Sequence, residues 1–326
     1  MKTIYLKVNA DSLDDKVIEQ AALIIKQGDL VAFPTDTVYG LGADALNETA
    51  VQKIFAAKGR PQDNPLILLV SSWEQACDYV RDIPDEAHAL VEKFWPGPLT
   101  LVLPARETVP DIIRAGLAQV GVRMPSHKAA LALIEKAGVP LAAPSANVSG
   151  RPSPTSAEHV KYDLDGRIAA ILDGGSTRLG IESTLLDMTS QPYRILRSGA
   201  ITIEDLEQSI PGKVIKADNE APAAKLAHYQ PRVKIIPFAS NDEMSESMAR
   251  RYGAKLGLVT LSEPTVFPNV EWHLVISGGV SEYGQRLFDI FRTADQHQIE
   301  YLFMELPESK ELGQAVADRI KQAAGS

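Results

Sequence analysis

The stretch KGRPQDNPL, residues 58–66, joins the end of a predicted helix to the start of a predicted strand and is termed the cationic loop. Residues 48–57 carry apolar side chains at helical spacing, Asn47 is a suitable N-cap, and Gly59 follows where such a helix would end. The apolar run at residues 66–70 then predicts a strand, and two prolines stiffen the connection. This order of elements places a rigid polar loop between a helix and a buried strand.

Two cations lie close together in this loop. Lys58 is at the helix end, where it could either stabilise the negative end of the helix dipole or bind an anion. Arg60 is two residues further on and next to proline, where it serves the helix dipole poorly. Because an arginine can grip two phosphate oxygens at once, the pair indicates a polyphosphate site.

Two more polar loops leave the ends of predicted strands. The threonine-rich loop PTDTVYGLG, residues 34–42, follows the apolar run 30–33, and the serine-rich loop APSANVSGRPSP, residues 143–154, follows residues 139–142. Taken alone, the serine-rich loop could be purely structural, because Ser, Asn, Gly and Pro are ordinary turn residues. Together the three loops form the candidate site.

The remaining pattern predicts an α/β fold with two sheets. Up to residue 214, predicted strands outnumber predicted helices, which indicates a twisted mixed sheet with flanking helices. Residues 217–231 are rich in Ala and Pro without apolar periodicity and predict a linker. Strands and helices alternate beyond it, which predicts a small Rossmann-like three-layer domain.

Composition narrows the classes of function. The 326 residues are 45% hydrophobic and 23% charged, an ordinary soluble composition with room for two domains. A formal net charge of −9 disfavours stable nucleic-acid binding over a broad surface. We expect a cytoplasmic protein, because no apolar run is long enough to span a membrane and the first residues form no secretory signal. The single cysteine, Cys77, and six dispersed histidines indicate neither a disulfide nor a dedicated metal site.

Five motifs occur in a fixed order along the first two thirds of the chain: PTDTVYGLG, KGRPQDNPL, VGVRMP, APSANVSGRPSPT and IESTLLD. This set resembles the YrdC family of L-threonylcarbamoyl-adenylate synthases, and the last third resembles the extra C-terminal domain of its long form. The resemblance implies a YrdC-like catalytic domain over residues 1–215, a linker over 216–232 and a Rossmann-like C-terminal domain over 233–326.

The activity that the resemblance implies is that of a nucleotidyltransferase in tRNA processing. Such an enzyme forms threonylcarbamoyl-AMP and pyrophosphate from L-threonine, bicarbonate or CO2, and ATP, with Mg²⁺ accompanying the ATP. The product would pass to a tRNA threonylcarbamoyl transferase machinery that makes threonylcarbamoyl-adenosine.

Family likeness also assigns the site residues. The residues expected to be catalytic are Lys58, Arg60, Ser145 and Asn147. Those expected to bind ATP are Lys58, Arg60, Asn64, Gln119, Ser145, Ser153, Arg197, His228 and Tyr229. Those expected to bind threonine are Thr35, Leu69, Arg123, Ala143 and Ser183. Taken alone, Arg123 could be a surface charge, and His228 and Tyr229 could be plain linker residues instead of a cover over the ATP site.

Three positions depart from the family pattern. Leu69 stands where a histidine is usual, Gln119 where a threonine is usual, and residues 221–224 read Ala-Pro-Ala-Ala in place of Ser-Pro-Gly-Met. The first departure bears on the threonine contact, and the last on the geometry of the linker, because it loses a glycine.

Three alternatives remain at this stage. The segment GLGADA, residues 40–45, matches a dinucleotide-binding pattern, although its glycines precede the next helix by several residues and no ribose-binding acid follows. A YrdC fold that binds RNA without catalysis would show RNA binding but no ATP turnover. Carbamoyl-adenylate synthesis is known from related carbamoyltransferases, but these carry acylphosphatase and zinc-finger segments that this sequence lacks.

Overall fold

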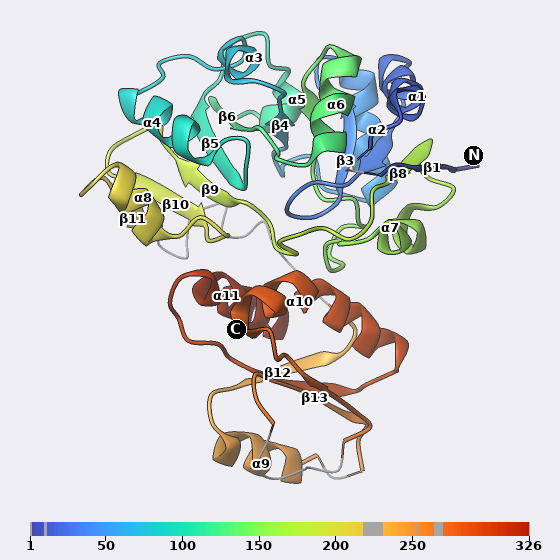
Figure 1. Ribbon diagram of the computed structural model, residues 1–326, viewed down its shortest axis with the longest axis vertical. Coiled ribbons are helices and arrows are strands. Elements are labelled where there is room, and N and C mark those ends of the chain that lie inside the picture. The colour runs from blue at the N-terminus through green and yellow to red at the C-terminus, as the bar shows by residue number, and fades with distance from the viewer. Residues whose placement is uncertain (1, 10–11, 218–230, 252, 264–269, 326) are drawn as a thin grey trace. The chain divides into compact units, whose positions relative to one another are not determined.

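The protein, seen here as a computed structural model, is described for residues 2–9, 12–217, 231–251, 253–263 and 270–325. It divides into two compact units (Figure 1). The first comprises residues 1–149, 153–178 and 182–226, and the second comprises 227–326 together with 150–152 and 179–181. Most of the predicted linker lies outside the described residues, so the domain boundaries drawn from the sequence stay predictions.

The first unit is built on an eleven-stranded mixed sheet. In spatial order its strands are β1 (Ile4–Lys7), β8 (Ala170–Asp173), β2 (Val31–Phe33), β3 (Gly40–Asp44), β7 (Leu141–Ala142), β4 (Ile67–Leu69), β6 (Gln119–Arg123), β5 (Leu99–Pro104), β9 (Thr184–Asp187), β10 (Tyr193–Arg197) and β11 (Val214–Lys216). The sheet contains both parallel pairs, such as β4 with β6, and antiparallel pairs, such as β5 with β6. The predicted mixed sheet is therefore confirmed.

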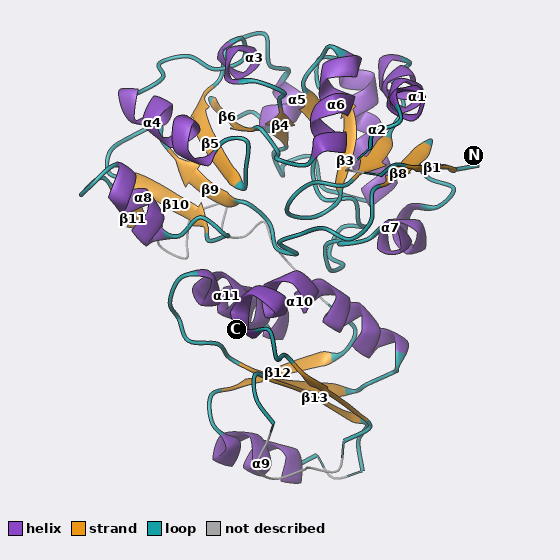
Figure 2. Ribbon diagram, viewed as in Figure 1, coloured by secondary structure: helices purple, strands orange, loops and turns teal. Residues whose placement is uncertain are grey.

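Helices accompany this sheet on both faces (Figure 2). They are α1 (Asp15–Lys26), α2 (Glu48–Lys58), α3 (Trp73–Cys77), α4 (Asp85–Phe94), α5 (Asp111–Arg114), α6 (Lys128–Ala137), α7 (Ala157–Leu164) and α8 (Ile203–Ser209). Because side chains alternate along a strand, Val31 and Phe33 join one apolar cluster with α1 and α6, whereas Ala32 joins another with α2. The sheet is thus buried on both sides.

Helix α2 delivers the cationic loop as the sequence predicts. The Asn47 side chain accepts from the backbone N–H of Ala50, and Gly59 ends the helix in the left-handed conformation with φ of 61°. Lys58 is the last helical residue. Its side chain therefore leaves the helix at the start of the loop.

The second unit has a four-stranded, fully parallel sheet in the order β12 (Lys234–Phe238), β15 (Tyr301–Glu305), β13 (Leu256–Thr260), β14 (Trp272–Val275). Helix α9 (Asn241–Ala249) lies on one face, and α10 (Gly279–Gln296) and α11 (Leu312–Ala324) lie on the other (Figure 2). This is the predicted Rossmann-like three-layer arrangement. Among the described helices, none is long and apolar enough to cross a membrane.

Two sequence predictions need correction. The threonine-rich loop ends early, because Gly40–Asp44 forms strand β3, antiparallel to β2. The reason is steric: a Cβ on Gly42 would lie 2.7 Å from the Phe33 ring, so this glycine permits a close strand approach. These glycines are strand residues rather than a phosphate-binding turn, which contradicts the dinucleotide-binding alternative.

The second correction concerns a helix start. The sequence Thr-Ser-Ala-Glu at residues 155–158 matches the capping-box pattern and predicts that a short helix opens there. The capping box is wrong, because Ser156 is the N-cap of α7 and accepts from the His159 backbone N–H. A capping box does occur at α8, between Thr202 and Asp205.

Candidate active site

Backbone hydrogen bonds hold the three loops together. In the threonine-rich loop, the Tyr39 carbonyl accepts from Ala146 N–H at 2.8 Å, and Tyr39 N–H donates to the Pro154 carbonyl at 2.8 Å. Both partners belong to the serine-rich loop. Ser149 of that loop donates its backbone N–H to the Lys58 carbonyl at 2.8 Å. Three segments far apart in sequence thereby meet in one place.

Lys58 is fully buried, with 1% of its surface exposed. Its ammonium donates to the backbone carbonyls of Ser145 and Asn147, the latter at 2.6 Å. Burial lowers the pKa of Lys58 well below the ordinary lysine value, the Arg60 cation lowers it further, and Asp163 opposes both. Lys58 therefore fixes the shape of the serine-rich loop, and its contact with a polyphosphate stays a prediction.

Arg60 and Arg197 place two guanidinium groups near one another. Arg60 donates to Asn64 and to the Pro65 carbonyl, the latter at 3.0 Å, which ties it to its own loop. Burial, together with the Arg197 cation and against the pull of Asp63, lowers the pKa of Arg60 to about 10. The group stays protonated at neutral pH, so this part of the site is electropositive and suited to an anion.

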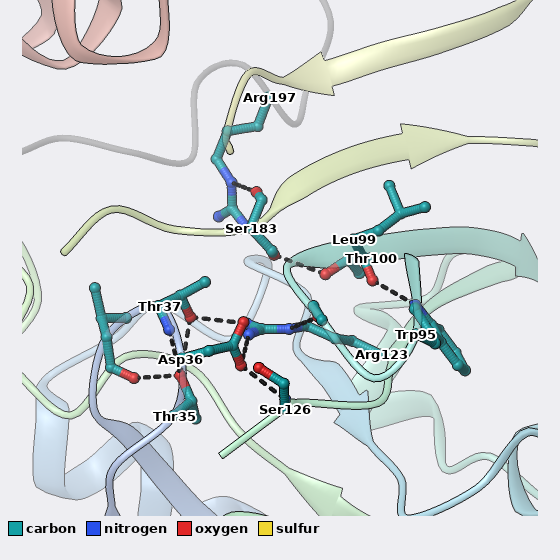
Figure 3. A network of polar contacts seen from close by, with 12 residues as sticks. Thr35, Asp36, Thr37, Trp95, Leu99, Thr100, Arg123, Ser126, Ser183 and Arg197 are labelled. Carbon is teal, nitrogen blue, oxygen red and sulfur yellow. Dashed lines mark hydrogen bonds and ion pairs between the residues drawn. The ribbon is translucent and has the colours of Figure 1, made fainter. Parts of the chain in front are cut away.

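Arg123 is the centre of a buried polar network (Figure 3). It lies at the end of β6 with 4% of its surface exposed. Its Nη2 donates to Asp36 Oδ1 at 2.6 Å, Nη1 to Thr37 Oγ1 at 2.8 Å, and Nε to the Gly97 carbonyl at 3.0 Å. The alternative that Arg123 is a surface charge is therefore wrong.

Further hydroxyl groups belong to the polar residues drawn with this arginine in Figure 3. Thr35 Oγ1 donates to the Val38 carbonyl at 2.6 Å and lies 2.9 Å from Thr37 Oγ1. Ser183 Oγ lies 2.7 Å from Thr100 Oγ1 and accepts from Arg197 Nη2 at 3.1 Å (Figure 3). Ser183 thus links Thr100 on β5 to Arg197 on β10.

The other residues expected to bind threonine are apolar. Leu69 pairs with Arg123 across the parallel strands β4 and β6 and is 2% exposed. Leu69 and Ala143 belong to one buried apolar cluster. Where the family pattern has a polar histidine, this chain therefore has a buried leucine, Leu69, beside the strand that carries Arg123.

The residues expected to bind ATP are spread more widely. Gln119 starts β6 and so lies at the other end of that strand from Arg123. Asn147 Nδ2 donates to the Val148 carbonyl at 2.9 Å, and Ser153 Oγ donates to Glu182 Oε1 at 2.7 Å. His228, Tyr229 and the Ala-Pro-Ala-Ala segment at 221–224 lie outside the described residues.

Sequence reasoning missed the acidic members of the site. Asp36 and Glu182 are both buried and both lie inside quoted motifs, TDT and IEST. Anionic substrates call for cations and neutral donors, so these carboxylates do not stand out in the sequence as members of the site. An acid between two threonines, directly after a buried strand, was the available signal.

Fold and site together define an α/β protein whose polar loops, with one buried arginine and two partly buried ones, are suited to phosphate and carboxylate groups. The Sua5_yciO_yrdC family, described as telomere recombination, matches residues 23–199, and the family described as threonylcarbamoyl-AMP synthase, C-terminal domain, matches residues 201–325. The chain therefore belongs to the Sua5/YciO/YrdC family, in the form that carries this C-terminal domain.

Individual relatives agree with this assignment. The chain is 42% identical to the threonylcarbamoyl-AMP synthase of Pyrococcus abyssi over 99% of this chain and 98% of that protein. It is 40% identical to the synthase of Bacillus subtilis over 96% of this chain and 94% of that one. The crystal structure of P. abyssi Sua5 complexed with L-threonine has a TM-score of 0.92 and 41% identity, covering 99% of this chain and 98% of that one.

Proposed function

We propose that this protein is a nucleotidyltransferase that makes threonylcarbamoyl-AMP and pyrophosphate from L-threonine, bicarbonate or CO2, and ATP. The observation that carries the proposal is a chain of contacts between two groups of cations. The buried Arg123 bonds to the threonine-rich loop, that loop bonds to the serine-rich loop, and the serine-rich loop bonds to Lys58 at the start of the cationic loop. The first group suits a carboxylate and the second suits phosphates. Full-length relatives that bear the name threonylcarbamoyl-AMP synthase support the same activity.

The amino-acid half of the site would hold L-threonine. Its carboxylate would bind Arg123, whose charge is fixed in place by three acceptors. Thr35 and Ser183 supply hydroxyl groups near this arginine, and Leu69 and Ala143 supply apolar surface. A small side chain with one hydroxyl and one methyl group matches such a mixed lining.

The nucleotide half would neutralise and orient ATP. In the proposed reaction, the amine of L-threonine adds to CO2, or to bicarbonate with loss of water, and gives a carbamate. A carbamate oxygen then attacks the α-phosphorus of ATP and pyrophosphate leaves, so catalysis rests on positioning and on charge stabilisation. Arg60 and Arg197 would face the phosphates, and Asn64 holds Arg60 in place. Lys58 would act by fixing the Ser145 to Asn147 segment, whose hydroxyl and amide then meet the nucleotide.

We propose that Mg²⁺ enters with ATP. The metal would neutralise charge on the leaving pyrophosphate. Among the described residues, no group of three or more His, Cys, Asp or Glu could hold a metal ion. The hydroxyl, amide and cationic donors of the site fit phosphate oxygens better than a bare cation, so the phosphates would supply the main ligands.

The place of the reaction in the cell is also a proposal. The product is a reactive anhydride, so a tRNA threonylcarbamoyl transferase machinery would consume it, in the cytoplasm. His228 and Tyr229 would then help exclude water from the anhydride. No observation of this chain favours RNA binding without catalysis or carbamoyl-adenylate synthesis, and both are outcomes of the test below.

The test is pyrophosphate release from ATP by the purified full-length chain with Mg²⁺, leaving out L-threonine and bicarbonate in turn. Release that requires both, together with a product of the mass of threonylcarbamoyl-AMP, is the expected result. ATP turnover that ignores threonine but requires an added carbamoyl donor, such as carbamoyl phosphate, would favour carbamoyl-adenylate synthesis. Tight RNA binding without any turnover would favour the RNA-binding alternative.

A further inference from the structure

The guanidinium of Arg123 is held by more groups than its charge requires. Three of its five N–H groups are used by Asp36, Thr37 and the Gly97 carbonyl. The other two have no partner among the described residues. Asp36 Oδ1 also accepts from the Ser126 backbone N–H at 3.0 Å, so the carboxylate is itself fixed from a second side (Figure 3).

Stability does not explain this arrangement. Asp36 and Arg123 form an ion pair with side chains 2% and 4% exposed, and a pair this deeply buried often costs as much in desolvation as it returns. In addition, Asp36 Oδ2 is buried without a hydrogen-bond partner among the described residues, which is a further cost. An apolar pair of similar volume would serve the fold at least as well.

We propose that Asp36 and Thr37 are positioning residues that fix the plane of the Arg123 guanidinium, so that its two remaining N–H groups face the substrate carboxylate. This inference rests on the proposed function, because it assumes that Arg123 binds the carboxylate of an amino acid. The TDT segment then has a divided role. Thr35 lies in the threonine pocket, whereas Asp36 and Thr37 act through the arginine.

The experiment compares D36N, T37V and T37S with the wild type by steady-state pyrophosphate release and by calorimetric titration with L-threonine. Asn at 36 keeps an acceptor for Arg123 but loses the charge. Val at 37 is isosteric and loses the acceptor, whereas Ser at 37 retains it. We expect the KM for L-threonine to rise about ten- to a hundred-fold in D36N, and less in T37V, because a charge-assisted hydrogen bond is lost.

Two further readouts separate positioning from a structural role. The KM for ATP should stay within about twofold of the wild type, and T37S should restore most of the threonine affinity that T37V loses. E86Q provides a remote control, because Glu86 on α4 bonds to Lys213 and Tyr193, which both lie outside the three loops. If D36N does not fold, the T37V and T37S pair decides alone.

The experiment gives different results if the positioning role is wrong and if the proposed function is wrong. An unchanged threonine KM in both D36N and T37V, with a threonine-dependent wild type, would overturn the positioning role. The positioning role would also be overturned if kcat and kcat/KM for both substrates decreased in proportion to a decrease in melting temperature. A wild type whose turnover ignores threonine would instead refute the proposed function itself.

Discussion

The Lys58 ammonium lies 2.6 Å from the carbonyl oxygen of Asn147, eighty-nine residues further along the chain. A second bond to the Ser145 carbonyl makes Lys58 a clamp on both ends of the Ser-Ala-Asn segment. Since Nζ is buried, the side chain serves the site first by shaping this segment. The interpretation of Lys58 as a plain helix-end cation does not account for these two bonds.

Replacing Lys58 with methionine tests the clamp. Met has similar length but no donor, so both carbonyls lose their partner and the segment is released. We expect kcat/KM for ATP to fall about 10²- to 10³-fold, as when a preorganised donor set is disturbed. The control is K53M on the same helix, since Lys53 bonds to Gly28 and Asp29 instead. Activity of K58M within twofold of K53M would refute the clamp.

The buried cation also predicts a pH dependence of stability. Burial lowers the pKa of Lys58 in the folded chain, whereas the unfolded chain keeps an ordinary value of about 10.4. Between these two values the unfolded chain binds more protons, so the folded chain gains stability as the pH rises. Below the folded pKa both states are protonated, and the cost of the buried cation is constant.

We therefore expect the unfolding free energy of the wild type, relative to K58M, to increase from neutral pH toward pH of about 10. Urea titrations at a series of pH values measure it, and the comparison with K58M removes the contribution of other titrating groups. A difference between the two proteins that is flat across this range would show that Lys58 keeps an ordinary pKa.

Sequence alone located the loops of this site but not their internal bonding. Hydrophobic periodicity and caps predict α2, because Asn47 and Gly59 act locally, and the apolar run at residues 66–70 predicts β4. The pairing of Asp36 with Arg123 spans 87 residues and depends on the register of strands that no local pattern specifies. Likewise, β3 was missed because its glycines, which serve close packing against Phe33, are the same residues that mark loops.

Gly199 offers a steric test of the strand that carries Arg197. A Cβ at this position would lie 2.3 Å from the Thr184 backbone nitrogen and 2.7 Å from the Glu182 carbonyl oxygen. Because both atoms are backbone, G199A must displace the chain. We expect a destabilisation of about 1–3 kcal/mol and a higher KM for ATP, since Arg197 is two residues away.

The matched control for this prediction is G284A. Gly284 lies within α10, where a Cβ would make only ordinary contacts of 3.5 Å or more. Alanine in a helix is favoured over glycine by about 1 kcal/mol, so G284A should be neutral or stabilising. Equal melting temperatures for G199A and the wild type would mean that the backbone around Thr184 yields easily.

The contacts of Glu86 predict an acid-sensitive interaction between α4 and the start of β10, at Tyr193. Glu86 bonds to Lys213, and Tyr193 donates its hydroxyl to Glu86 at 3.0 Å. The bond to Lys213, a backbone bond and the Tyr193 hydroxyl lower the pKa of Glu86 to about 2. Because this value lies below the unfolded value of about 4.3, the stabilisation is fully present above pH of about 4.3 and is lost as the pH falls toward 2.

The wild type should therefore be more stable than E86Q at pH 7, and the two should converge at low pH. Thermal melts of both proteins between pH 7 and pH 2.5 measure this, and a difference that persists unchanged to the lowest pH would mean that Glu86 acts through packing and not through its charge.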